Sequence, residues 1–368
     1  MGEVVPKSGI GVAIDHLSQR CPAQIDGRQS TICRLIGSAL TGLQFWATRL
    51  GWIGLCLVLI LVTSGCSTKL GYFARSMADP LRPHAYRFAD GATSIYYRLN
   101  PDVTPSAMTL FFIPGSGCAS LRYYLRAYLA ALPKSVQVYA LQKRHVDDRE
   151  MGIGVCDTDF ASEDVFPQWV YDQTDFVRQI SKQASLQGKP VVVLGVSEGG
   201  NTAAAVAASV PEVTHLAIIG SGGMTQIDEL RLLFDRNYPG HQLDRAFAAV
   251  AADPDSTVQR VYGQTFRYWS SVAHVDPMRY YNHIDIPILL GIGERDTSTP
   301  VESAYLLRDR FAALGKSNLE LLVYPDADHT LVDVRRGVSY RPEFLRHLVQ
   351  WALGKTDANT ANRMGATQ

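Results

Sequence analysis

The most informative segment of the sequence is VVVLGVSEGGNTAAAVAASV, residues 191–210. Its first four residues are a continuous apolar run, which predicts a strand buried on both faces. Residues 202–210 are mostly alanine and valine and predict a helix, which the following proline ends. The turn between them carries one hydroxyl, Ser197, flanked by Gly195 and Gly199, where a Cβ atom would clash with the strand and the helix. The sequence therefore predicts a sharp strand-to-helix turn with a serine at its tip.

The position of Ser197 predicts a nucleophile. A serine on such a turn presents its Oγ at the carboxyl end of a sheet and at the N-terminus of a helix, where developing negative charge is favoured. The pattern G-x-S-x-G alone also fits an ordinary glycine-rich turn. The strand before it and the helix after it favour the nucleophile.

A nucleophilic serine needs a base, and the base needs an acid that orients it. Two later apolar strands end in polar loops, in IPILLGIGERDTSTP (286–300) and LELLVYPDADHTL (319–331). We expect His329 to be the base because its ordinary pKa lies near neutrality and it follows the last strand. We expect Asp296 to be the acid rather than Glu294, because Asp296 lies deeper in its loop and nearer the next helix.

Two backbone N–H groups are expected to bind the oxyanion of the tetrahedral intermediate. One belongs to Glu198, the residue after the nucleophile. The other lies in the loop PGSG after the strand 110–113, where Ser116 is the first choice and Gly117 the alternative. An ordinary tight turn would explain the glycines of this loop but not their placement after this strand.

Four motifs in this order, PGSGC, GVSEGG, GERDTSTP and DADHT, resemble the α/β-hydrolase superfamily over residues 85–354. The resemblance implies an α/β-hydrolase fold with a mostly parallel, doubly covered sheet, as the alternating strands and helices also indicate. It further implies a serine hydrolase that works through an acyl-enzyme on Ser197, and among the possible reactions we favour the hydrolysis of carboxylic ester or thioester bonds. One departure is Pro114-Gly115, where the superfamily usually carries His-Gly. The backbone donor survives this change, but a side chain that usually supports the loop is missing.

The remaining elements are expected to complete this fold. The predicted elements are a hairpin over 84–100, a helix over 121–132, a strand over 135–141, a helix over 166–188 closed by Gly188, and a strand over 214–223.

An insertion at 224–284 is predicted to form a helical lid between late strands, with helices over 227–238, 243–252 and 256–275. Its many aromatic residues allow two interpretations. They line an apolar pocket for the substrate, or they form the small core of the lid itself.

Composition excludes several other classes. Hydrophobic residues make up 46% of the chain, and the formal net charge is +0, which gives no electrostatic basis for nucleic-acid binding. The sequence shows no phosphate-binding loop, no dinucleotide site and no metal-ligand cluster, so we expect no cofactor and no metal. The expected partner is a small-molecule ester or acyl substrate.

The N-terminal region contains a predicted targeting signal. Residues 50–62 contain no charged residue and have the length of the apolar segment of a signal peptide. The motif VTSGCS that follows resembles the processing site of bacterial lipoproteins, which implies a lipid on Cys66. The expected location is the bacterial cell envelope, as a periplasm-facing lipoprotein held to the membrane by this lipid. An uncleaved anchor in the inner membrane is the alternative.

These features divide the chain. The expected parts are an N-terminal extension over 1–48, unstructured or due to a start assigned too early, a signal peptide over 49–65, a linker over 66–84, the hydrolase domain over 85–355 and a disordered tail over 356–368.

Cysteine usage agrees with export. With Cys66 lipidated, the processed chain keeps Cys118 and Cys156, which follow neighbouring strands at the same edge of the sheet. An oxidising envelope favours a disulfide between them, and two buried free thiols are the alternative.

Two other functions stay open. The first is a peptidase or acyltransferase on the same fold, since Gly199-Gly200 also resembles prolyl-oligopeptidase-like enzymes, although a region of this length has no room for their propeller. The second is a non-catalytic envelope lipoprotein that has kept the fold.

Overall fold

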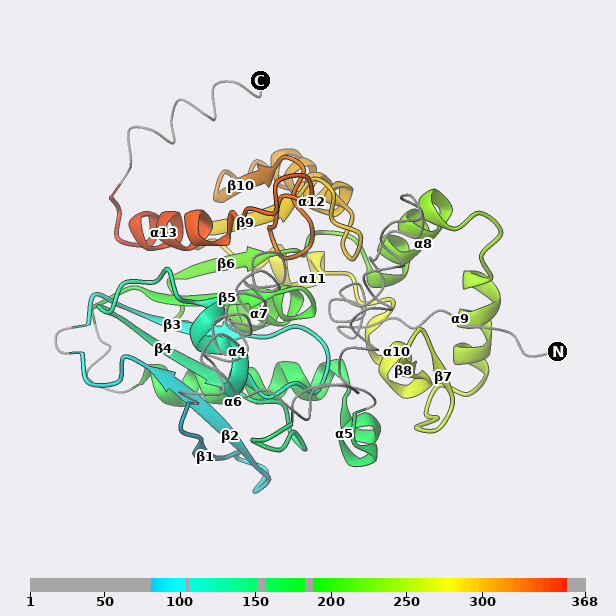
Figure 1. The fold of residues 1–368 in the computed structure, drawn as a ribbon, viewed down its shortest axis with the longest axis horizontal. Helices are drawn as coiled ribbons and strands as arrows, with labels where there is room; N and C mark the ends of the chain where they lie inside the picture. The colour runs from blue at the N-terminus through cyan, green and yellow to red at the C-terminus, as the bar shows by residue number, and fades with distance from the viewer. Residues whose placement is uncertain (1–80, 104–105, 151–155, 183–187, 356–368) are drawn as a thin grey trace, which may run out of the picture. The chain divides into compact units, whose positions relative to one another are not determined.

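A computed structural model describes residues 81–103, 106–150, 156–182 and 188–355. Within them the chain forms an eight-stranded sheet in the order β1-β2-β4-β3-β5-β6-β9-β10 (Figure 1). The strands are β1 (His84–Arg87), β2 (Thr93–Leu99), β3 (Met108–Ile113), β4 (Val136–Leu141), β5 (Val191–Val196), β6 (His215–Ile219), β9 (Ile288–Gly293) and β10 (Leu319–Tyr324).

The sheet is mostly parallel. The strands from β4 to β10 run parallel to one another, whereas β1 and β2 form an antiparallel hairpin whose second strand pairs antiparallel with β4. Every residue of β3, β4 and β9 is buried. Their mostly apolar sequences are typical of strands that are covered on both faces.

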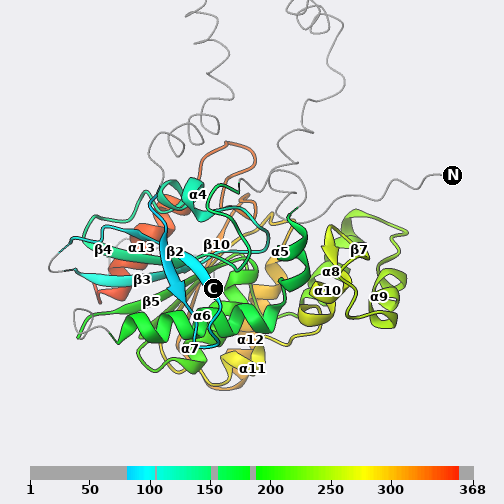
Figure 2. The ribbon, with the colours of Figure 1, turned by 90° about the horizontal axis from the view of Figure 1, so that it is seen from below.

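Helices cover both faces, so the predicted α/β-hydrolase fold is confirmed. One group of helices lies below the strands in Figure 2, and a second, upper group packs on the opposite face of the sheet. The lower group is α6 (Phe166–Ser181), α7 (Glu198–Ser209), α11 (Met278–Tyr281) and α12 (Val301–Ala313), and the upper pair is α4 (Leu121–Tyr128) and α13 (Arg341–Ala352). The two groups bury separate apolar clusters against the two faces of the sheet.

The insertion between β6 and β9 contains α8 (Gln226–Asn237), α9 (Leu243–Ala252), β7 (Arg260–Val261), β8 (Gln264–Thr265) and α10 (Phe266–Val272). These elements gather to one side of the sheet (Figures 1 and 2). We call this insertion the lid. Its two ends lie side by side, because the Ile227 N–H donates a hydrogen bond of 3.0 Å to the carbonyl oxygen of Ala273.

The predicted helix over 256–275 is wrong in its first half, where the chain forms the β7–β8 hairpin. The hairpin turns at Tyr262 and Gly263, whose φ angles are 48° and 82°. Two positive φ angles in a row are what a tight two-residue hairpin turn requires. Only α10 remains helical.

The aromatic residues of the lid pack mainly on one another. Phe247, Tyr262, Phe266, Tyr268 and Trp269 are all buried in a cluster separate from the two clusters of the sheet. Their arrangement favours the interpretation that they form the core of the lid rather than the wall of a substrate pocket.

Helix α6 ends at Ser181, so the predicted closure at Gly188 is wrong. Ile180 is the last residue of α6 in the apolar core, and Gly188, with a φ of 74°, lies in a turn before β5. The sequence also gave no indication of α5 (Thr158–Glu163), which Asp157 caps.

The predicted extension, signal peptide, lipidation residue Cys66 and C-terminal tail lie outside the described residues. The described part begins at Leu81, which is buried in the core, so that the fold takes up the last residues of the predicted linker. None of the helices in the described part has the length and apolar character needed to cross a membrane.

Candidate active site

The candidate site lies at the carboxyl edge of the parallel strands. The residues Ile113, Val196 and Ile219 end β3, β5 and β6, and the register pairs Val196 with Ile219. Because neighbouring parallel strands end at the same edge, the loops that follow them meet there. Ser197 follows β5, Asp296 follows β9 and His329 follows β10, which places all three at this edge.

Ser197 stands on a strained turn. Its φ and ψ angles are 58° and −128°, a conformation that costs a residue with a side chain on the order of 1–3 kcal/mol. The Ser197 N–H donates to the carbonyl oxygen of Ile219 over 2.9 Å, and the Gly200 N–H donates to the Ser197 carbonyl over 2.8 Å. These bonds hold the serine between the end of β5 and the first turn of α7.

Close backbone packing explains the glycines of this turn. A Cβ atom on Gly195 would lie 2.1 Å from the Gly199 carbonyl oxygen. A Cβ atom on Gly199 would lie 2.4 Å from the carbonyl oxygens of Ile113 and Pro114. The turn therefore packs directly against the end of β3 and the start of the loop predicted to bind the oxyanion.

Asp296 and His329 are hydrogen-bonded. The distance from Asp296 Oδ2 to His329 Nδ1 is 2.6 Å, and Asp296 is buried. The other carboxyl oxygen, Oδ1, accepts the N–H groups of Ser298 and Thr299 over 2.7 and 2.8 Å. Burial alone would lower the pKa of His329, but nearby carboxyl groups, chiefly that of Asp296, together outweigh this effect and raise it. The carboxyl of Glu294 is exposed and accepts the Asp326 N–H instead.

The ring of His329 packs against Gly220, which lies close to Ser197. Gly220 follows Ile219, the residue whose carbonyl binds the Ser197 N–H. An added Cβ atom on Gly220 would lie 2.9 Å from Cε1 of His329, the carbon between the two ring nitrogens. The imidazole, the acid and the serine thus share one corner of the sheet, as a nucleophile, base and orienting acid require.

The two predicted oxyanion donors lie at the same edge. Glu198 is the first residue of α7, and Ser116 is half-buried three residues after β3. The alternative donor, Gly117, has a φ of 102°. Their role as donors stays a prediction.

The structure joins Cys118 and Cys156 in a disulfide bond, with Cα atoms 5.8 Å apart. The bond packs with Val146 and Phe160 in a small apolar cluster. It therefore links the end of the oxyanion loop to the segment that leads into α5.

Sequence reasoning missed the side chain of Glu198, which it considered only for its backbone. The carboxylate is buried and forms an ion pair of 2.8 Å with Lys143, and the Tyr268 hydroxyl donates a hydrogen bond to it. A charged residue directly after the nucleophile, and Lys143 two residues after the end of a buried strand, were the available signals. Among the described residues, no group of three or more His, Cys, Asp or Glu side chains is placed to hold a metal.

Solved structures share this architecture. The chain is similar to an acylaminoacyl peptidase of Pyrococcus horikoshii, with a TM-score of 0.52, 13% identity, and coverage of 76% of this chain and 43% of that one. It is also similar to an esterase of Pyrococcus furiosus, with a TM-score of 0.50, 18% identity, and coverage of 76% and 92%. At such identities these likenesses establish the fold alone. No curated protein sequence gives a significant match.

The fold and the site define a serine hydrolase with the α/β-hydrolase fold. The chain belongs to the prolyl oligopeptidase family, whose model matches residues 167–358, more than half of the 368 residues.

Proposed function

We propose that the protein hydrolyses carboxylic ester or thioester bonds of small acyl substrates through an acyl-enzyme on Ser197. The observation that carries this proposal is the hydrogen bond of 2.6 Å between the buried Asp296 and His329, at the sheet edge where the strained Ser197 stands. A buried acid that orients an imidazole beside a serine on such a turn serves nucleophilic catalysis.

The geometry supports a two-step reaction. His329 accepts the proton of Ser197 Oγ through Nε2 as the oxygen attacks the acyl carbon, while Asp296 holds the proton on Nδ1 and stabilises the imidazolium. The N–H groups of Glu198 and Ser116 bind the developing oxyanion. The alcohol or thiol then leaves with the proton from His329, and a water molecule releases the acyl group by the same route in reverse.

Ester cleavage makes the smaller demand on this site. An alkoxide or thiolate is a better leaving group than an amine, which leaves only after His329 has protonated its nitrogen. The family match favours a second candidate, a peptidase, because the matched model is that of the prolyl oligopeptidases. An acyltransferase would use the same acyl-enzyme with another acceptor in place of water.

A paired substrate series separates these functions. Each acyl group is offered as a p-nitrophenyl ester and as a p-nitroanilide, with a fluorophosphonate probe in parallel. We expect the ester to be hydrolysed faster and Ser197→Ala to abolish both turnover and labelling. Ser209→Ala on the same helix is the control. The Ser209 hydroxyl donates to the Ala205 carbonyl of its own helix, and the Ser209 carbonyl, which accepts from Arg178, is kept in the variant, so it should behave like the wild type.

Each result decides between the candidates. Faster cleavage of the anilides would favour the peptidase, and turnover that appears only with an added alcohol or amine would favour the acyltransferase. If the wild-type protein neither turns over substrate nor reacts with the probe, the result would favour the hypothesis of a non-catalytic lipoprotein. Full activity of Ser197→Ala would overturn the mechanism.

We also propose that the protein is an envelope lipoprotein anchored through Cys66. The support is the uncharged segment 50–62 followed by the processing motif VTSGCS. A lipid anchor would hold the hydrolase domain at a membrane surface.

A further inference from the structure

A buried polar cluster contacts the nucleophile turn through the side chain of Glu198, the residue after Ser197. It consists of Lys143, Asp164, Glu198 and Tyr268, which we call the Glu198 network. Lys143 Nζ lies 2.8 Å from a carboxyl oxygen of Glu198 and 2.8 Å from one of Asp164. The Tyr268 hydroxyl donates to the second carboxyl oxygen of Glu198.

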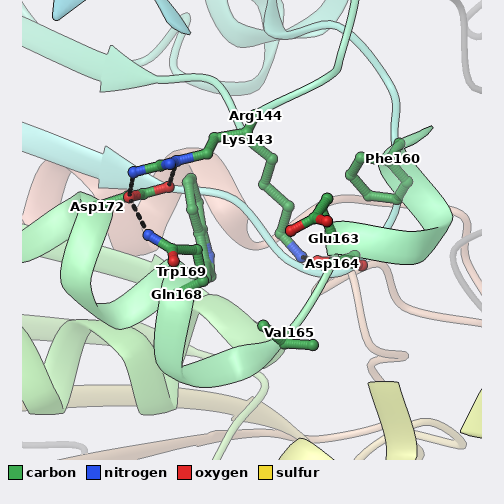
Figure 3. A pocket seen from close by; sticks show the side chains of 9 residues that line it. All are labelled: Lys143, Arg144, Phe160, Glu163, Asp164, Val165, Gln168, Trp169 and Asp172. Atoms are coloured by element: carbon green, nitrogen blue, oxygen red, sulfur yellow. Dashed lines mark hydrogen bonds and ion pairs between the residues drawn. The ribbon is translucent and has the colours of Figure 1, made fainter. Parts of the chain in front are cut away.

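Four separate elements supply these side chains. Lys143 follows β4, Asp164 follows α5, Glu198 begins α7, and Tyr268 lies on α10 of the lid. Figure 3 shows Lys143 reaching down beside Trp169 to the carboxylate of Asp164. Its ammonium group lies 5.5 Å from the centre of the Trp169 ring, within the range of a cation–π interaction.

The network is fully enclosed. The side chains of Lys143, Asp164 and Glu198 are 4%, 6% and 3% exposed, and Tyr268 is 2% exposed. Burial alone would lower the pKa of Lys143, but the two carboxylates outweigh it and raise that pKa, so the ammonium stays charged. Burial and the Glu198 carboxylate raise the pKa of Tyr268 well above its ordinary value, so the hydroxyl keeps its proton and remains a donor.

Stability alone does not account for such a cluster. Removing charged groups from water costs several kcal/mol per ion, and well-packed apolar side chains often stabilise a protein as well or better. Both carboxyl oxygens of Glu198 are bonded in this network, and buried hydrogen bonds of this kind fix the position of the groups they join. The second carboxyl oxygen of Asp164 is buried without a partner among the described residues. The member that matters here is Glu198, whose backbone N–H is the proposed oxyanion donor and whose neighbour is Ser197.

The strained turn needs such support. A residue held at a φ of 58° keeps that conformation only when its surroundings fix it. The lid is one of these surroundings, since Tyr268 is its contact with Glu198. Two further bonds seat α10 on the body of the protein, from the Phe166 N–H to Ser271 Oγ (3.0 Å) and from Thr265 Oγ1 to the Ala161 carbonyl (3.4 Å).

We propose that Tyr268 is a positioning residue through which the lid holds the nucleophile turn in its reactive shape. With the Tyr268–Glu198 bond formed, the Glu198 carboxylate is fixed between the lid and Lys143, and the backbone of residues 197–199 is held with it. When the lid moves away, this restraint is released and the turn relaxes. The position of the lid thereby sets the activity of the site.

Removal of the Tyr268 hydroxyl tests the proposal. Tyr268→Phe keeps the ring in the lid core and deletes the hydroxyl that bonds Glu198. The matched control is Tyr281→Phe, since the buried Tyr281 hydroxyl has no hydrogen-bond partner among the described residues. Two quantities are measured on the full chain. They are the rate of hydrogen exchange of the backbone amides over 195–201, and the kcat and KM for a p-nitrophenyl ester.

We expect Tyr268→Phe to speed amide exchange over 195–201 at least fivefold and to lower kcat about tenfold, the effect of a lost bond of about 1.4 kcal/mol. The KM should change less than twofold, because the bond acts on the turn and not on the bound substrate. Tyr281→Phe should leave both quantities unchanged. A second variant, Lys143→Met, should speed exchange over the same segment, because it removes the other support of Glu198.

The kinetic part of this inference rests on the proposed function, and the exchange part does not. Unchanged amide exchange over 195–201 in both Tyr268→Phe and Lys143→Met would overturn the role of the network, whatever the activity. Faster exchange with an unchanged kcat would overturn the link between lid and catalysis. A wild type inactive on every ester would overturn the proposed function alone, since the exchange rates would still decide whether the lid holds the turn.

Discussion

Glu229 of the lid and Ser303 of α12 share a hydrogen bond of 2.6 Å in the interior of the protein. Burial, with a smaller contribution from the Asp296 carboxylate, raises the pKa of Glu229 to about 8 against the opposing effect of the Ser303 bond. At neutral pH the acid is therefore mainly uncharged. It is a titratable group at the base of α8 that the proposed reaction does not use.

The protonation of Glu229 predicts a pH dependence of stability. Its folded-state pKa lies above the ordinary value of 4.5, so the proton stabilises the folded state fully below about pH 4.5. This contribution falls as the pH rises towards about 8, by at most about 1.4 kcal/mol per pH unit. Glu229→Gln removes it, so the variant should gain stability relative to the wild type between pH 5 and 8. Urea unfolding at several pH values measures the difference, and an identical pH dependence in both proteins would contradict the assignment.

The close approach of Gly220 to His329 predicts a sensitive position. In Gly220→Ala the new Cβ atom would lie 2.9 Å from the imidazole, at a residue whose φ is +64°. We expect kcat to fall about a hundredfold, because a displacement of about 1 Å in a catalytic group costs that much. Gly240→Ala is the control, since Gly240 has a φ of +82° but nothing within 4 Å of the added atom. An equal effect of both substitutions would mean that backbone strain, and not the displaced ring, causes the loss.

The two acids of the loop after β9 are expected to differ strongly. Asp296→Asn should lower kcat by about four orders of magnitude, because the amide leaves His329 in the wrong tautomer. Glu294→Gln should retain most of the activity, because its carboxyl is exposed and does not contact the imidazole. Steady-state kinetics of both variants on one ester give the comparison, and the opposite ranking would assign the role to Glu294.

The disulfide is expected to serve both stability and turnover. The Cys118–Cys156 bond spans a sequence separation of 38 residues, which is worth roughly 3 to 4 kcal/mol in the chain-entropy model. The double variant Cys118→Ser, Cys156→Ser should lower the melting temperature, and it should lower kcat because the oxyanion loop loses its tether. Mass spectrometry of unreduced peptides detects the bond in the wild type. Free thiols at both residues, or a variant that melts like the wild type, would exclude this role.

Lipidation predicts a labelling pattern at the N-terminus. Cells fed a palmitate analogue should label the wild type and Cys56→Ser but not Cys66→Ser. Cys56 is the matched control because it lies within the apolar segment ahead of the processing motif. Label that persists in Cys66→Ser, or a purified protein that still begins at Met1, would rule out lipoprotein processing.

Local signals in the sequence predicted most of the fold and the placement of the candidate triad. Each of these signals is a short segment of about fifteen residues. They are the apolar run that leads to Ser197 and the two later strands with the polar loops that follow them. The β7–β8 hairpin escaped because its turn, Tyr262-Gly263, interrupts a pattern that also fits a helix. The Glu198 network was not predicted, because its bonds join residues that are far apart in the sequence. Lys143 lies 55 residues and Tyr268 lies 70 residues from Glu198. No local pattern signals which distant side chains will meet a buried carboxylate.

The bond between Ile227 and Ala273 has a practical consequence for protein engineering. This bond brings the two ends of the lid together. The segment 276–287, which contains α11, then connects the end of the lid to the amino end of β9. The residues between these ends form a cassette that can be exchanged while the crossover and the strand register stay intact. Grafting the corresponding cassette of another hydrolase onto this junction offers a route to altered substrate preference, provided that the donor supplies a hydroxyl where Tyr268 now meets Glu198.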